Sequence, residues 1–504
     1  CIRPLGLRVH RKHEEPPFHA SLVHACNRSR SPTRGAFACW KALMLAIACA
    51  GALRMPVMKF EVSSQPSPQQ SMLRRGLLTS AAAASSVTAF AANAASLSGH
   101  AARLRRWGPV LGGPFDFPSA SRATVRRDVV PGRIWSFEQV QGVIYVHVPV
   151  RMTVVKLNEG GLFVYAPVAP TAECLQLLAE VEAEAGPVRH ILLPSLALEH
   201  KYFAGAFARS RPSAKFWVAS YQYSFPLNLP LWAQGFPADT RVLPDDYLDA
   251  PPNWAKQLPY RTLGPLTEKV GGYQEVVVFD TATKSLLVTD LVVSIPDEPP
   301  AVLRANDERA LLYHSRDFPA DQVQLTDEAC SIGWRKICLF ALYFQSSPLA
   351  VASPPDGTLS GAVRFFRAAF PPEVTPTARA LGWNGFFAWS WRPAWRDAFE
   401  TLRNSGRPLV PPILQVAVLN REPQIVIDFV HRVADDFAFV RICPCHFAPE
   451  VSAGPREWSE AFDFLRKAPL STKGALPDAD LAFLREFEQG LVKLGSIRSA
   501  APKV

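Results

Sequence analysis

From residue 142 onward, the hydrophobic pattern alternates between segments that are typical of strands and one that is typical of a helix. Residues 142–157, GVIYVHVPVRMTVVKL, are β-branched and aromatic and are long enough for a pair of strands. A Gly-Gly turn then leads into a strand over residues 160–168. Residues 171–186 open with Thr171, repeat apolar residues at helical spacing and stop at a Gly-Pro pair, which predicts a helix. Residues 188–195, VRHILLPS, then form a buried strand.

The same alternation continues along the chain. The pattern predicts a short helix over residues 201–212, a strand over 214–220, a hairpin over 275–293, a strand running into a loop over 437–447, and a closing helix over 456–467. The predicted order begins with strands, continues with a β-α-β unit and then repeats a similar set. This order is typical of an α/β (α+β) sandwich with helices outside two sheets. We therefore expect an αββα sandwich.

The length and composition are compatible with one large domain. The chain has 504 residues, of which 48% are apolar and 19% charged, as in a globular protein. We divide it into a targeting presequence and linker (1–125), a sandwich domain (130–470) and a C-terminal tail with a short helix (471–504). The apolar stretch at residues 336–351 is too short and too mixed to indicate a transmembrane span in the body.

The positive charge lies almost entirely in the N-terminal quarter. Residues 1–127 carry 18 Lys and Arg against 4 Asp and Glu, a net charge of +14, and the rest of the chain has a net charge of −4. A nucleic-acid-binding surface needs basic residues clustered on the folded part, and the sequence of the body shows no such cluster. We therefore expect no nucleic-acid partner.

The N-terminal segment resembles a series of targeting signals. Residues 41–53 combine a basic residue with a short apolar run, as in a signal-peptide core. Residues 71–96 hold paired arginines, Arg74 and Arg75, an Ala-rich run and an Ala-Asn-Ala cleavage site, as in a twin-arginine signal. Together with the Ser- and Pro-rich stretch between them, they predict a transit peptide into a plastid (chloroplast), with the stroma and the thylakoid lumen as the two open destinations. A single signal anchor and a spurious upstream translation are the alternatives.

A short loop carries the candidate chemistry. Residues 193–201, LPSLALEHK, follow a buried strand and end in the adjacent acid and histidine Glu199 and His200. Zinc hydrolases of the metallo-β-lactamase type carry H-x-H-x-D-H after such a strand, and the spacing here fits position by position. Ser195 and Ala197 stand in place of the first two histidines, and Glu199 in place of the aspartate.

The chain more closely resembles a domain-of-unknown-function family of photosynthetic organisms that is regarded as metallo-β-lactamase-like. The resemblance covers roughly residues 135–467 and rests on VIYVHVPVRMTVVKL, LPSLALEHK, FPLNLPLW, LLVTDLVV and CPCHFAP. It implies a fold that typically holds two metal ions. The first ion would need three histidines, and here two are replaced while none occurs between His200 and His314.

Two interpretations of the second metal site stay open, one bound metal ion or a metal-free relic. Its positions are held by Glu199, His200, Asp290 at the end of LLVTD, and His446 after a late strand. Two carboxylates and two imidazoles suit one zinc ion or another divalent metal, and a set of three ligands leaves one position open for water. If this interpretation holds, the four side chains converge on one point.

Two functions of different classes follow from these observations. The first is a mononuclear metal-dependent hydrolase of unknown substrate. The second is a pseudoenzyme, a non-catalytic binding or scaffold protein that keeps the fold, with a small molecule or a protein as its partner. Each candidate ligand also has a structural interpretation, because an aspartate at a strand end is often a turn former and a Glu-His pair is often only hydrogen-bonded.

Overall fold

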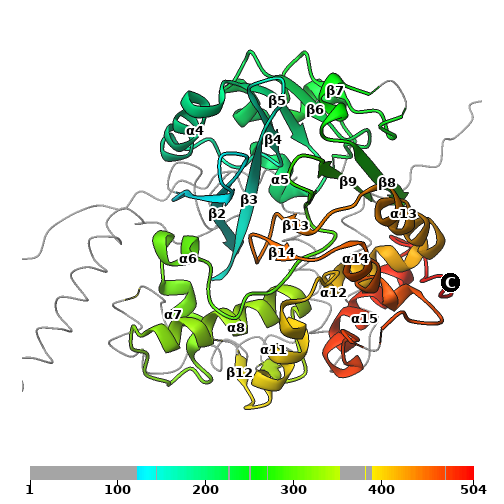
Figure 1. The fold of residues 1–504 in the computed structure, drawn as a ribbon. Coiled ribbons are helices and arrows are strands. Elements are labelled where there is room, and N and C mark those ends of the chain that lie inside the picture. The colour runs from blue at the N-terminus through cyan, green and yellow to red at the C-terminus, as the bar shows by residue number, and fades with distance from the viewer. Residues whose placement is uncertain are drawn as a thin grey trace, which may run out of the picture.

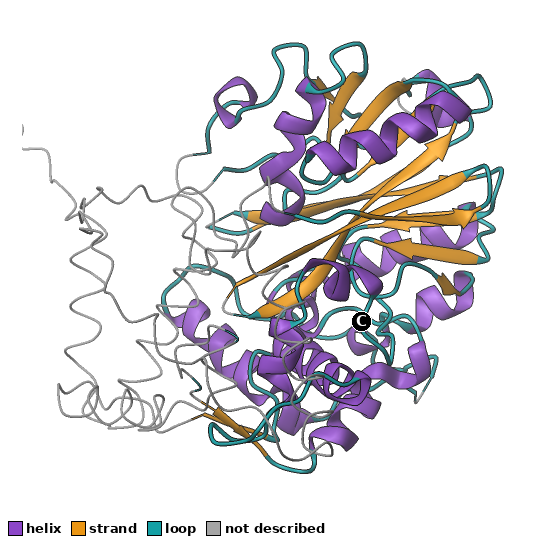
Figure 2. Ribbon diagram, turned by 90° about the vertical axis from the view of Figure 1, so that its left-hand side faces the viewer, coloured by secondary structure: helices purple, strands orange, loops and turns teal. Residues whose placement is uncertain are grey.

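The computed structural model describes residues 122–504 except 144, 225–227, 249–250, 270, 352–380, 382–386, 388 and 472. The targeting signals expected in the N-terminal segment lie outside the described residues. Two β-sheets stack against each other, with helices on both outer faces and a further group of helices at one end (Figure 1, Figure 2).

The first sheet has seven strands in sequence order. They are β1 (Val125–Val130), β2 (Ile134–Val143), β3 (Val146–Lys156), β4 (Leu162–Tyr165), β5 (Val188–Leu193), β6 (Lys215–Val218) and β7 (Arg241–Val242). The strands up to β4 are antiparallel, whereas β4 to β7 run parallel. Parallel neighbours need crossover helices, and α4 (Ala172–Ala185) and α5 (Leu198–Arg209) supply two of them. The side chain of Thr171 caps α4, as the sequence predicted.

The second sheet has five strands in the order β14-β13-β10-β9-β8. Their bounds are β8 (Tyr260–Thr267), β9 (Gly272–Asp280), β10 (Ser285–Val288), β13 (Arg441–Pro444) and β14 (Val451–Ser452). Strands β9 and β10 form the predicted hairpin. Strand β13 pairs parallel to β10 although a long stretch of chain separates them, and this pairing places the ends of the two strands side by side.

Three apolar cores hold the layers together. One joins the first sheet to α4 and α5, one joins the two sheets, and one joins the second sheet to α13 (Pro423–Asp436) and α14 (Pro455–Glu460). Figure 2 shows the strands as stacked layers with helices outside both. This order of layers confirms the αββα sandwich.

A helical group completes the molecule in the lower part of Figure 1. It contains α6 (Ala301–Asn306), α7 (Arg309–Ser315), α8 (Asp327–Tyr343), α11 (Trp395–Arg403), α12 (Pro412–Ala417) and α15 (Asp478–Lys493), with the short strands β11 (Leu349–Val351) and β12 (Trp389–Trp391). Its core is rich in buried tryptophan, namely Trp334, Trp389, Trp391 and Trp395. The described tryptophans around residue 390 therefore pack in this core. Within the described residues, no helix is long and apolar enough to cross a membrane.

Several element bounds differ from the sequence-based expectation. Residues 146–156 form one long strand, whose antiparallel partner is β2 rather than a second strand from the same stretch. The helix predicted to end the domain is only α14 and a short 3-10 turn, Asp463–Leu465. Beyond residue 470, where we expected a tail with a short helix, α15 has 16 residues and buries Leu481 and Leu484 in the helical core.

The contact between α7 and α8 requires a glycine at position 333. A methyl group there would lie 1.9 Å from the carbonyl oxygen of Leu311, so Gly333→Ala forces backbone apart. We expect this substitution to lower the free energy of unfolding by about 2 kcal/mol or more. The control is Gly490→Ala in α15, where a methyl group meets nothing within 4 Å. It should raise stability by up to about 1 kcal/mol, because alanine favours helix. Chemical denaturation of both variants measures this, and equal effects would contradict it.

Candidate metal centre

Three side chains from different parts of the chain meet where the two sheets join. His200 lies in the first turn of α5, Asp290 follows the end of β10, and His446 follows the end of β13. Because β10 and β13 are parallel neighbours, with Val288 opposite Pro444, the residues two positions beyond each are also adjacent. The facing sheet is joined at the same place by a hydrogen bond from the amide of Val276 to the carbonyl of Pro194, just after β5.

The carboxylate of Asp290 lies between the two imidazoles. Its Oδ1 is 3.0 Å from Nε2 of His446 and 3.4 Å from Nε2 of His200. The ring centroids of the two histidines are 5.2 Å apart. One ligand atom from each of the three residues lies within 4.8 Å of the others, and no other such group of three or more occurs in the part of the chain that the structure describes.

The hydrogen bond of His446 fixes which of its nitrogens is free. Nδ1 lies 2.9 Å from the carbonyl oxygen of Pro149, which can only accept, so Nδ1 carries the proton and donates. In the neutral ring, Nε2 then holds a lone pair that faces the carboxylate of Asp290. Despite the 3.0 Å separation, the geometry there is not that of a hydrogen bond, and Nε2 has no other partner. Two acceptors this close need either a proton on Nε2 or a cation between them.

Two further polar atoms of the group also have no hydrogen-bond partner. Oδ2 of Asp290 and Nδ1 of His200 are both buried without one. Buried polar atoms in proteins are almost always paired, and a cation bound here would satisfy all three. Imidazole nitrogen and carboxylate oxygen are both ligands of zinc and related divalent metals. The donor set and its unsatisfied atoms therefore fit a metal ion.

Electrostatics couple Asp290 and His200. Burial alone would raise the pKa of Asp290. The adjacent His200 and His446 outweigh this effect of burial, so the pKa of Asp290 is lowered. Burial alone would lower the pKa of His200, but the carboxylate of Asp290 outweighs it, and the pKa is raised. At neutral pH Asp290 is therefore an anion that attracts any cation available, whether a proton or a metal.

A buried carboxylate that the sequence analysis missed holds Asp290 in place. Glu275, on β9, accepts hydrogen bonds from the amides of Thr289, Asp290 and Leu291 at 2.7–3.0 Å and from the hydroxyl of Tyr273 at 2.6 Å. Burial, followed by repulsion from Asp290, raises the pKa of Glu275. The sequence signal was a single acid within the apolar run of β9, which indicates a buried charge with a dedicated partner.

A buried arginine holds the loop that carries His446. Arg151, on β3, is fully buried and donates to the carbonyls of Pro444, Phe447 and Ala448 at 2.6–3.1 Å. Its Nε also donates to the carboxylate of Glu138 at 3.0 Å. The backbone on both sides of His446 is thereby fixed to the first sheet.

The structure brings together three of the four predicted ligands. Glu199 is half-buried in the first turn of α5, and neighbouring helix positions point about 100° apart, so it is not part of the group around Asp290. In the first half of the loop LPSLALEHK, the side chain of Ser195 binds backbone instead. Its hydroxyl accepts a hydrogen bond from the amide of Ala197. The expected loop also ends early, because α5 begins at Leu198 rather than near Lys201.

Comparisons with known proteins place the chain in a family. The model of the domain of unknown function DUF4336 matches residues 131–464, and the chain belongs to this family. A search of curated proteins gave no match.

Similar solved structures include two metallo-β-lactamases and a flavodiiron core. A metallo-β-lactamase from Pontibacter korlensis is 13% identical over 43% of this chain and 99% of its own, with a TM-score of 0.26. The mono-zinc form of FIM-1 from Pseudomonas aeruginosa is 11% identical over 44% and 97%, with a TM-score of 0.25. The metal-soaked Flv1 flavodiiron core from Synechocystis sp. PCC6803 is 10% identical over 68% and 60%, with a TM-score of 0.32. Scores this low say nothing about the site.

The shifted pKa values predict how pH affects the metal-free protein. Because the pKa of His200 is raised on folding, its stabilising contribution is complete below about pH 6.5 and is lost as pH rises through the raised value. Because the pKa of Asp290 is lowered, its contribution is present above about pH 3.9 and is lost on acidification. With a chelator present, the free energy of unfolding should fall between neutral and alkaline pH.

Asp290→Asn removes the charge that raises the pKa of His200, so this fall should become smaller. The exposed Asp239→Asn is the matched control and should leave the profile unchanged. Urea denaturation across pH measures both, and identical profiles for Asp290→Asn and the wild-type chain would contradict the coupling.

Proposed function

We propose that the protein binds one divalent metal ion, zinc being the first choice, through His200, Asp290 and His446, and that it is a metal-dependent hydrolase. The observation that supports this most directly is the orientation of His446. Its Nδ1 donates to Pro149, as metal-binding histidines donate their second nitrogen to a carbonyl, and its Nε2 faces the carboxylate of Asp290 without a hydrogen bond. Three protein ligands also match the number that catalytic zinc sites use.

Such an ion, when bound, lowers the pKa of a coordinated water and polarises a carbonyl or phosphoryl group. The chain itself supplies orientation and charge. Arg151 fixes the loop of His446, and Glu275 fixes the turn of Asp290, so both ligands sit on supported backbone. Asp290 supplies the negative charge that offsets part of the charge of the cation. Glu199 follows from the sequence as a fourth ligand and stays a prediction. It is the neighbour of His200 in the chain but lies outside the group of His200, Asp290 and His446.

The burial of the site favours a second candidate. The side chain of His200 has no exposed surface, that of His446 is 9% exposed, and that of Asp290 is 15% exposed. A substrate would have little access to an ion held there. This observation supports a non-catalytic binding or scaffold protein that retains the sandwich, with the three residues as a structural cluster.

Metal content decides between metal binding and a metal-free cluster. We expect the full-length protein, purified without chelator and dialysed, to carry close to one equivalent of zinc or another divalent metal by mass spectrometry. Asp290→Asn should lose most of it, since Asp290 is the only anionic residue among the three that converge, whereas Asp239→Asn should keep it. Added zinc at about a hundred times its dissociation constant should stabilise the wild-type chain by roughly 2.7 kcal/mol and the Asp290→Asn variant far less.

Hydrolysis of ester, lactam and phosphodiester substrates by the metal-loaded protein then separates the two candidates. Activity that is absent from Asp290→Asn supports the hydrolase. Bound metal without any such activity supports the non-catalytic protein, and equal metal content in both variants would rule out the proposed site.

We also propose that the protein is a plastid protein directed by its N-terminal signals, with the thylakoid lumen as the destination. The support is the order of the basic, apolar and twin-arginine segments in the sequence. A fluorescent fusion of the full chain should accumulate in plastids. Replacing Arg74 and Arg75 by lysine should keep it in the stroma, and cytosolic fluorescence of the unmodified fusion would refute the proposal.

A further inference from the structure

A cavity of about 810 Å³ lies at the edge of the first sheet formed by β5, β6 and β7. Its lining includes His190 near the start of β5, whereas His200 lies beyond the end of the same strand. The cavity and the candidate metal centre are therefore at opposite ends of β5. A volume of this size is within the range of small-molecule binding sites.

The lining of this cavity is strongly basic. It contains Arg189, Lys215, Arg241 and Lys256 but a single acid, Glu159. All four basic side chains are exposed at its rim, and none forms an ion pair with another residue in the described part of the chain. Strand register gathers them, because His190 pairs with Lys215 and Trp217 with Arg241. An excess of positive charge around one concave site attracts anions.

Aromatic rings form the wall between these cations. Trp217 and Trp254 approach edge to face with centroids 6.3 Å apart, and His190 lies 6.4 Å from Trp254. The guanidinium of Arg241 lies over the ring of Trp217 at 5.5 Å. The indole N–H of Trp254 is buried and has no hydrogen-bond acceptor, although a buried donor of this kind is normally paired.

His190 adds an uncharged ring to this wall. Burial, and then the charges of Lys215, Arg189 and Arg241, lower the pKa of His190 to about 4. The ring is therefore neutral at physiological pH and does not add to the charge of the cavity. It offers a flat polarizable face instead.

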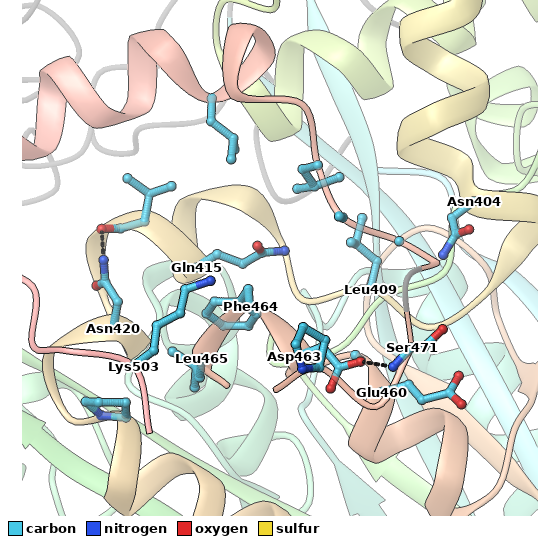
Figure 3. A pocket seen from close by; sticks show the side chains of 18 of the residues that line it. Asn404, Leu409, Gln415, Asn420, Glu460, Asp463, Phe464, Leu465, Ser471 and Lys503 are labelled. Carbon is cyan, nitrogen blue, oxygen red and sulfur yellow. Dashed lines mark hydrogen bonds between the residues drawn. The ribbon is translucent and has the colours of Figure 1, made fainter. Parts of the chain in front are cut away.

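A second cavity differs from the first because several of its charged side chains are paired within the protein. It has a volume of about 560 Å³ and lies between α12, α14 and the C-terminal segment (Figure 3). There Asp463 accepts from the amides of Leu470 and Ser471, and Glu460 pairs with Arg407 at 3.1 Å. The charges of Asp463, Glu460 and Arg407 in this cavity are thus already paired or hydrogen-bonded.

We propose that the cavity at the β5–β7 edge binds a small anion that carries a planar ring, of the kind that a nucleoside diphosphate represents. The four cations would contact the phosphate groups, since Arg and Lys are the usual phosphate ligands. The ring would stack beside Arg241 on the half-buried Trp217, against which the buried Trp254 packs. Nothing in this proposal depends on whether the distant centre holds a metal.

Calorimetric titration of the full-length protein with ADP tests the proposal. We expect saturable binding of one ADP per chain, weakened by added salt because exposed charges are screened. Adenosine and inorganic phosphate, each with half of the recognised features, should both bind at least about tenfold more weakly. Lys215→Ala with Arg241→Ala should weaken ADP by about tenfold or more. Glu159→Gln, which removes the single acid, should strengthen it.

The matched control is Arg127→Ala. Arg127 is an exposed arginine on β1, at the opposite edge of the same sheet, and its loss should leave ADP affinity unchanged. Circular dichroism confirms that each variant folds. The proposal is overturned if ADP does not bind at millimolar concentration, if Arg127→Ala weakens binding as much as the double variant, or if phosphate alone binds as tightly as ADP. The last result would mean an adventitious ion only.

Discussion

The candidate metal centre depends on one buried guanidinium. Arg151 belongs to the first sheet, but three of its acceptors are carbonyls of the loop that follows β13 in the second sheet. The same strand supplies the carbonyl of Pro149, which orients His446. A buried arginine is tolerated only when its donors are paired, and here the pairing partners are the backbone of the site. The longest strand of the first sheet thus fixes the backbone that carries His446 after the second sheet.

Two neighbouring carboxylates, Glu275 and Asp290, have different roles at the centre. Glu275 faces inward, accepts from four donors and is shielded from water, whereas Asp290 faces the two histidines and keeps one oxygen without a partner. Burial, followed by repulsion from Asp290, raises the pKa of Glu275, whereas the two histidines outweigh burial and lower the pKa of Asp290. One acid is therefore a structural acceptor and the other is available to a cation, although both lie within the same apolar surroundings.

The sequence predicted the sandwich because its elements carry local signals: alternating or continuous apolar runs for the strands and a threonine cap for α4. The joint assignment of His200, Asp290 and His446 came from the resemblance to the metallo-β-lactamase type of loop, and the structure brings these three side chains together. The start of α5 escaped prediction because the residue that precedes the helix, Ala197, has no side chain that can cap it. Glu275 and the basic cavity escaped because their partners lie far away in the sequence, and only strand pairing brings Lys215 and Arg241 next to His190 and Trp217.

The parallel pairing of β10 with β13 has a consequence for how the molecule folds. More than a hundred residues, including the helices from α6 to α13, separate the two strands in the chain. Contacts of such long sequence separation form slowly, because the intervening loop must first be closed at an entropic cost. His446 reaches Asp290 only when β13 has paired with β10, so the complete centre requires this long-range contact. A substitution that weakens this pairing would separate His446 from Asp290 even if every side chain of the centre were kept.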